Sequence, residues 1–77
     1  MENRLYKTKD LGEAAALVVM NVQLFEVERE GKVCWFIFNN IDQCKLLSNQ
    51  YFFGELMVNA REYTEATLRL KNRIFNR

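Results

Sequence analysis

A β-hairpin is encoded by residues 22–39, which read VQLFEVEREGKVCWFIFN. β-branched and aromatic residues dominate both halves of this stretch, 22–29 and 32–39, and such residues favour strands. Glu30 and Gly31 separate the two halves and predict a tight turn, because glycine adopts a positive φ without strain. The stretch therefore predicts two antiparallel strands joined by a two-residue loop.

The position of that loop decides which residues lie opposite one another across the hairpin. The expected pairs are Val27 with Cys34, Phe25 with Phe36, and Gln23 with Phe38. Because alternate residues of a strand share a face, these side chains form an aromatic face that we assign to the core. Leu24, Trp35 and Ile37 lie on the opposite face, which is acidic near the turn. We expect that face to be half covered or to serve as a contact surface.

An edge strand and three amphipathic helices are predicted around the hairpin. The strand covers residues 4–8, the first helix 10–20, the second begins after 40, and the third begins after 59. Asp10 and Glu13 have the spacing of a capping box. Asn59 and Glu62 repeat this spacing, and the asparagines at 39–40 can cap the second helix. We therefore expect the order short edge strand, helix, β-hairpin, two helices.

Length and composition indicate a single domain over residues 1–77. A chain of 77 residues is long enough for one hydrophobic core, and 49% of its residues are hydrophobic. The predicted class is α+β, with the helices packed on one face of a small antiparallel sheet. Eleven basic residues against ten acidic ones leave a net charge of +1, so only a local patch could attract nucleic acid or anionic lipid.

The N-terminal residues and the cysteines bear on location. The chain begins MENRLYKTKD, which places charges where a signal peptide is apolar, and no apolar run approaches the ~20 residues that span a bilayer. Cys34 and Cys44 are too few for a secreted disulfide framework, and both fall on faces predicted to point inward. We expect a cytoplasmic protein without a membrane partner, in which both thiols are free and buried.

The residue inventory favours no catalytic, cofactor or metal site. The chain has no histidine, so the commonest general base and metal ligand is missing, and Ser48 is its only serine. Glu26, Glu28 and Glu30 could pair as carboxylates, but acidic residues beside a turn are ordinarily solubilising charges. Isolated glycines form no phosphate-binding loop. We therefore expect a protein that is not an enzyme.

Two sets of side chains are candidates for binding. Arg61, Arg69 and Arg73 on the third helix, with Lys7 or Lys9, could contact the phosphates of a nucleic acid, although cations near a helix C-terminus also complement its dipole. The partner-binding candidates are Trp35, Ile37, Phe52 and Phe75, which are large apolar side chains at or near the predicted surface. Trp35 or Phe75 could also lie in the interface of a homodimer.

Several short segments form a pattern along most of the chain: Tyr6-x-Thr8-x-Asp10-Leu11, Ala14-Ala15-x-Leu17, Phe36-x-Phe38, Tyr51-x-x-Gly54 and Leu70-Lys71 with Ile74. Together they resemble a family of small uncharacterised domains of bacteria, archaea and their viruses. This resemblance implies a viral, phage or mobile-element setting and supplies no site residues. The function expected first is an adaptor or inhibitor that binds a protein partner, such as a component of host defence. The alternative is a nucleic-acid-binding accessory or regulatory protein that uses the basic last helix.

Overall fold

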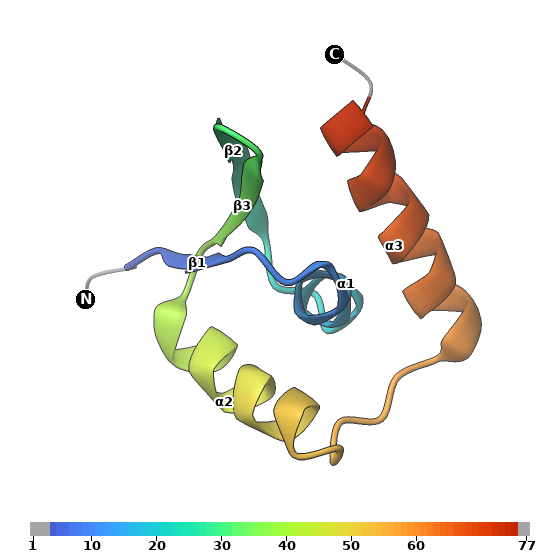
Figure 1. Ribbon diagram of the computed structural model, residues 1–77. Helices are drawn as coiled ribbons and strands as arrows, with labels where there is room; N and C mark the ends of the chain where they lie inside the picture. Colours follow the sequence, from blue (N-terminus) through green and yellow to red (C-terminus); the bar gives the residue numbers. More distant parts are fainter. Residues whose placement is uncertain (1–3, 76–77) are drawn as a thin grey trace.

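The computed structural model describes residues 4–75 and has an α+β fold (Figure 1). Its elements are β1 (Tyr6–Thr8), α1 (Leu11–Val19), β2 (Leu24–Glu30), β3 (Val33–Phe38), α2 (Ile41–Phe52) and α3 (Ala60–Phe75). This order is the one that the sequence predicts. None of these helices combines the length and the apolar character needed to traverse a membrane, within the part of the chain described.

The three strands form one antiparallel sheet in the order β1-β3-β2. The central strand β3 pairs with β1 through Tyr6–Phe38 and Thr8–Phe36, so the N-terminal segment is an edge strand as predicted. Phe36 and Phe38 are fully buried on the face that meets the helices. The aromatic side of β3 is therefore the core side, which confirms its assignment from the sequence.

The register of the hairpin differs from the predicted one. The loop is Gly31-Lys32 rather than Glu30-Gly31, and Val27 lies opposite Phe36 instead of Cys34. When the loop moves by one residue, each residue of β2 pairs with a residue of β3 two positions further along. Because side chains alternate between faces with a period of two, those near the turn stay on the predicted face of the sheet.

A bulge between Leu24 and Glu26 then changes the faces at the start of β2. Leu24 lies opposite Phe38 and packs on the core, whereas Phe25 is 56% exposed. The predictions that Phe25 and Gln23 face the core are therefore wrong, because one extra residue in a strand reverses the alternation that follows it.

The capping residues are those that the sequence predicts, but Glu13 does not complete the predicted capping box. Its carboxylate accepts hydrogen bonds from Tyr6 and Thr8, and the Asp10 N–H donates to Thr8 Oγ1. The Asp10 carboxylate accepts a hydrogen bond of 2.8 Å from the backbone N–H of Glu13. Asn40, with φ of 65°, and Asn59 accept equivalent bonds from the third residue beyond each of them. These bonds satisfy N–H groups that the first helical turn leaves without partners.

Helix α1 lies at the centre of the fold. Its residues Ala14, Ala15 and Leu17 are buried against the aromatic face of β3, and α2 and α3 pack on α1 from two sides (Figure 1). Small alanine side chains allow this close approach of neighbouring elements. Helix α3 has few contacts with the strands. Its C-terminal end lies at the same end of the molecule as the hairpin turn (Figure 1).

Candidate functional site

The predicted partner-binding side chains lie on three separate parts of the surface. Trp35 and Ile37 belong to the outer face of β3, away from the helices, and Ile37 is buried there. Phe52 ends α2 and is 60% exposed, and Phe75 ends α3 and is 77% exposed. The C-terminal ends of α2 and α3 point to opposite ends of the molecule (Figure 1). The four side chains therefore do not form one site.

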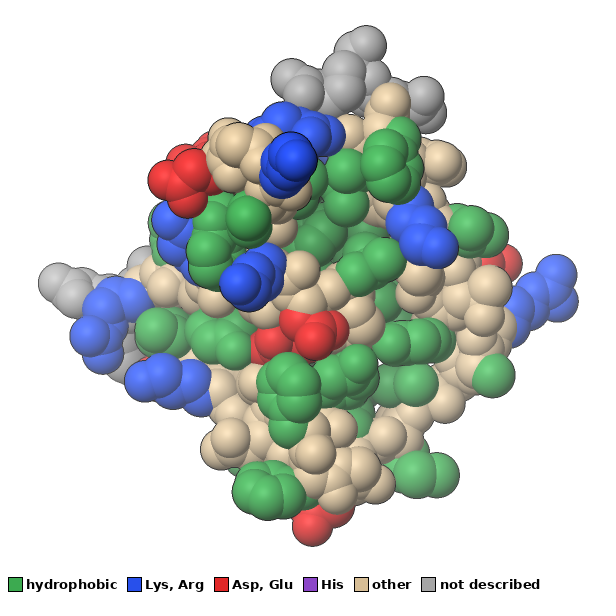
Figure 2. All heavy atoms as spheres, in the orientation of Figure 1, with side chains coloured by type: hydrophobic (Ala, Val, Ile, Leu, Met, Phe, Trp, Pro, Cys, Tyr) green, Lys and Arg blue, Asp and Glu red, His purple; other side chains and the backbone are tan. Residues whose placement is uncertain are grey.

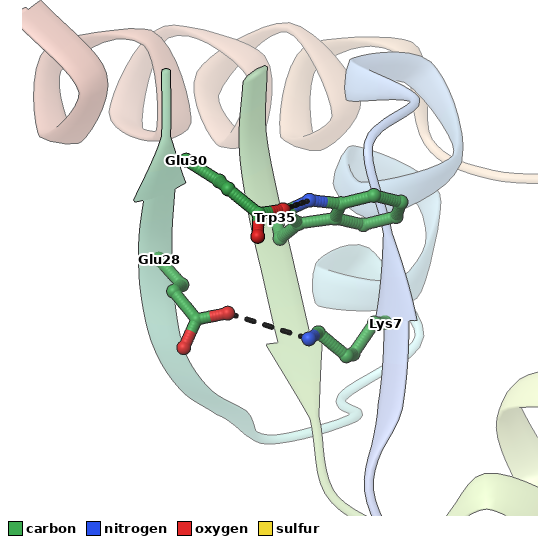
Figure 3. Close-up of polar contacts among 4 residues, drawn as sticks. All are labelled: Lys7, Glu28, Glu30 and Trp35. Carbon is green, nitrogen blue, oxygen red and sulfur yellow. Dashed lines mark hydrogen bonds and ion pairs between the residues drawn. The ribbon is translucent and has the colours of Figure 1, made fainter. Parts of the chain in front are cut away.

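Trp35 is held in place by charged neighbours on the outer sheet face (Figure 3). Its indole Nε1 donates a 3.2 Å hydrogen bond to Oε1 of Glu30. Lys7 lies 5.7 Å from the ring centroid, within the range of a cation–π contact, and pairs with Glu28 at 3.3 Å. This face has no helix over it, and its tryptophan is half covered by these side chains.

The arginines of α3 do not form one basic face. Arg61 pairs with Glu65 at 3.6 Å, one turn further along the helix. Arg69 lines a shallow hollow together with Glu62 and Glu65, so acidic groups neutralise this part of the helix. Arg73 follows Arg69 by one turn, at the end of α3, and lines a different hollow beside the hairpin.

A groove opens between the hairpin turn and the C-terminal end of α3. Its volume is about 400 Å³, and its apolar lining comes from Leu11, Val33, Cys34, Phe36, Ile74 and Phe75. Figure 2 shows apolar side chains gathered between the hairpin and α3, with Lys and Arg side chains on both sides. The groove exists because α3 packs on α1 and leaves the hairpin end of the core face partly uncovered.

The charged residues of this groove are all basic. Lys9, Arg29 and Lys32 line it, and Arg73 lines the adjoining hollow together with Arg29 and Cys34. No described carboxylate forms an ion pair with any of these four side chains within 4.0 Å. Four cations around an apolar floor create a positive local potential in a chain whose net charge is only +1.

Arg29 joins the two walls of the groove. Its guanidinium donates a 2.7 Å hydrogen bond to the backbone oxygen of Ile74, in the last turn of α3. Arg29 and Lys32 were not among the binding residues predicted from the sequence. The signal that could have found this role is strand alternation: Arg29 shares the inward face with Val27, so its side chain extends toward the helices.

The two cysteines have different environments. Cys44 is buried, and its thiol lies 3.5 Å from the backbone oxygen of Asn39. Burial, with a smaller contribution from the Glu13 carboxylate, raises the pKa of Cys44 to about 11. Cys34 is only partly buried and lines the groove. The expectation that both thiols are buried is therefore wrong for Cys34, which faces inward where no helix covers it.

A buried polar cluster lies at the start of α1. The Glu13 carboxylate is 3% exposed and accepts hydrogen bonds from the hydroxyls of Tyr6, at 2.5 Å, and Thr8, at 2.6 Å. The Tyr6 hydroxyl also lies 3.3 Å from that of Ser48 on α2. Burial and the bond to Glu13 raise the pKa of Tyr6. These contacts connect β1, α1 and α2 and leave the carboxylate closed to a substrate.

The described residues contain no group of three or more His, Cys, Asp or Glu side chains arranged to hold a metal ion. Comparison with protein-family models, with curated proteins and with solved structures found no match. The surface itself therefore provides the observations on which a function can be proposed.

Proposed function

We propose that this chain is a non-enzymatic interaction module, an adaptor or inhibitor that binds a protein partner. The observation that carries the proposal is the groove between the hairpin and α3, with the exposed Phe75 at its rim. Protein interfaces concentrate their binding energy in a few aromatic and arginine side chains around an apolar centre. Phe75, Arg29 and Arg73 supply these residue types in one place.

Affinity capture from a host lysate tests the proposal with two matched phenylalanine variants. Phe75→Ser changes the groove, and Phe52→Ser changes an equally apolar residue at the end of α2. We expect one host protein to be retained by the parent and by Phe52→Ser, and to be lost with Phe75→Ser. Circular dichroism verifies that both variants are folded. Retention of that protein by all three chains contradicts a role for the groove.

The second candidate function is nucleic-acid binding. Sequence reasoning proposed Arg61, Arg69 and Arg73 as phosphate contacts, and the acidic neighbours of the first two weaken that arrangement. The observation that favours it is the cluster of Lys9, Arg29 and Lys32 near Arg73.

A salt titration of binding to random duplex DNA separates the two functions. Phosphate contacts release counterions, so affinity for DNA falls steeply as salt rises. We expect no measurable binding at physiological salt. Submicromolar binding with a steep salt slope, weakened by Arg73→Gln, favours the nucleic-acid function. The viral setting and the cytoplasmic location remain expectations drawn from the resemblance and from the N-terminal sequence.

A further inference from the structure

We infer that the groove receives an acidic amphipathic helix of the protein partner, an inference that rests on the proposed function. The occupant is defined by its chemistry: an apolar stripe faces the floor, and aspartate or glutamate side chains flank that stripe. Both features match what the groove presents, which is an apolar floor and a basic rim.

The packing of the fold favours a helix as the occupant. In a two-layer α+β domain, helices cover one face of the sheet. Here α1 covers the part of that face around Phe38, whereas α3 packs mainly on α1 and is joined to the hairpin end by the hydrogen bond from Arg29 to Ile74. The helical layer is thus incomplete above Cys34, which is only partly buried. An apolar helix face with anchors at i, i+3, i+4 and i+7 can complete it.

The charge of the rim favours an acidic partner. Arg29 belongs to β2 and Arg73 to α3, whereas Lys9 and Lys32 lie in loops; among the described residues no acidic side chain lines the groove. Carboxylates placed beside these cations gain Coulomb energy and charge-assisted hydrogen bonds, and arginine can bind a carboxylate with two parallel bonds. A basic helix is repelled by the same rim, so charge supplies specificity as well as affinity.

The floor of the groove favours a protein over a single-stranded nucleic acid. Bases stack on exposed aromatic faces. The floor is mainly aliphatic, from Leu11 and Ile74, and the Phe36 ring is only 1% exposed. One exposed aromatic, Phe75, remains at the rim. Aliphatic surface of this kind is better covered by leucine or isoleucine side chains of a helix than by nucleobases.

The experiment uses two designed helical peptides, each about five turns long (~18 residues). Both carry the same leucine stripe, flanked by glutamate in one peptide and by lysine in the other. The readout is the rate at which a thiol reagent labels Cys34 in the full chain, and the buried Cys44 serves as the internal folding reference. We expect the glutamate peptide to slow Cys34 labelling at least tenfold at saturation. The lysine peptide should leave the rate unchanged.

Charge reversal on α3 gives the specificity control. Arg73→Glu changes the rim of the groove, whereas Arg69→Glu makes the same change one turn earlier, beside the hollow that contains Glu62 and Glu65. We expect Arg73→Glu to lower the affinity for the glutamate peptide at least tenfold and to permit binding of the lysine peptide. Arg69→Glu should leave both results as in the parent.

Three outcomes overturn the inference. They are equal protection by both peptides, no protection by the glutamate peptide, and protection by an oligonucleotide in place of the peptide. If the glutamate peptide fails while host-protein capture still depends on Phe75, the acidic helix is wrong and the interaction function stands. If host-protein capture is also independent of Phe75, the proposed function fails with it.

Discussion

At the scale of single residues, Glu13 shows how the interior accommodates a carboxylate that pairs with no basic side chain of the described residues. It is 3% exposed, and its oxygens accept hydrogen bonds from Tyr6 and Thr8. A buried carboxylate needs such donors, because losing one of them leaves a desolvated oxygen at a cost of about 1–3 kcal/mol. Among the described residues, every buried side-chain polar atom has a hydrogen-bond partner. Glu13 therefore belongs to the packing of β1, α1 and α2 around one another.

Phe36 and Phe25 have opposite environments, and truncating each of them tests the observed register. Phe36→Ala removes a fully buried ring and should lower the free energy of unfolding by about 3–5 kcal/mol. Phe25→Ala truncates a side chain at the bulge that is already 56% exposed, and should cost less than about 1 kcal/mol. Urea denaturation of both variants measures the difference. Similar large losses for both would restore the predicted pairing of Phe25 with Phe36.

Stability should decline in alkaline solution because two groups, the buried Cys44 thiol and the partly buried Tyr51 hydroxyl, resist ionisation in the folded protein. Burial and the neighbouring Glu13 raise the pKa of Cys44 from 9.0 to about 11. Burial and the hydrogen bond with Tyr63 raise the pKa of Tyr51 from 10.0 to about 12. Both groups ionise more readily in the unfolded chain. Their contribution to stability is thus complete below pH 9 and is lost as the pH rises through 11 to 12.

Thermal melts between pH 8 and pH 12 measure this decline. Cys44→Ala should have a lower Tm at pH 8 but a shallower fall between pH 9 and 11, because alanine does not ionise. Tyr51→Phe should reduce the fall of Tm between pH 10 and 12, because phenylalanine does not ionise. If Tm falls with pH as steeply in both variants as in the parent, other groups govern the alkaline transition.

At the scale of elements, the contact of α1 with α2 depends on Gly12. A Cβ at this position would overlap the Tyr51 hydroxyl of α2, and it would lie 3.1 Å from the Tyr63 hydroxyl of α3. The Tyr63 hydroxyl also donates a 3.2 Å hydrogen bond to the Gly12 carbonyl. Both outer helices therefore meet α1 at a residue without a side chain.

Gly12→Ala should destabilise the protein, although the same change ordinarily stabilises a helix by up to about 1 kcal/mol. The overlap with Tyr51 should outweigh this gain and give a net loss of about 1–3 kcal/mol. In a Tyr51→Phe background the overlapping oxygen is absent, and the alanine should be neutral or stabilising. A double-mutant cycle by urea denaturation measures the coupling between the two positions. If the effects of Gly12→Ala and Tyr51→Phe on the free energy of unfolding are additive, the strain does not come from the overlap with the Tyr51 hydroxyl.

At the scale of the whole molecule, apolar side chains remain exposed in several regions. They include Phe25 at the start of β2, Phe52, Phe53 and Met57 around the end of α2, and Leu68 and Phe75 on α3. A domain of 77 residues has too little polar surface and too few elements to cover all its large side chains. A twofold dimer through Phe75 or Trp35, expected from the sequence, stays a prediction.

The basic groove makes that dimer dependent on salt. A twofold interface at Phe75 brings Arg29, Lys32 and Arg73 of one copy toward the same residues of the other. Their repulsion is screened as ionic strength rises. Sedimentation velocity at micromolar concentration should therefore show more dimer at 0.5 M salt than at 0.05 M, and Phe75→Glu should abolish it. Dimerisation that weakens with salt, or that survives Phe75→Glu, places the interface elsewhere.

Local patterns in the sequence were sufficient for the elements and for part of the core. The capping asparagines and Asp10, the helical spacing of Ala14 and Leu17, and the alternation of Phe36 with Phe38 each involve residues less than a few positions apart. Hydrogen bonding and side-chain periodicity act over that range, so the α+β order followed from them.

Contacts between distant segments decided the rest, because packing energies depend on which surfaces meet. The hairpin register follows from a one-residue shift of the turn and a bulge at Phe25. The bulge turns Leu24 toward the core beside the buried Phe38, a long-range contact that turn preference does not reveal. The groove exists because α3 docks on α1, and that docking brings Lys9, Arg29 and Arg73 together from far apart in the chain. The sequence by itself determined the helices, the strands and the inward side of β3. Only tertiary structure decided which charges surround an open apolar surface.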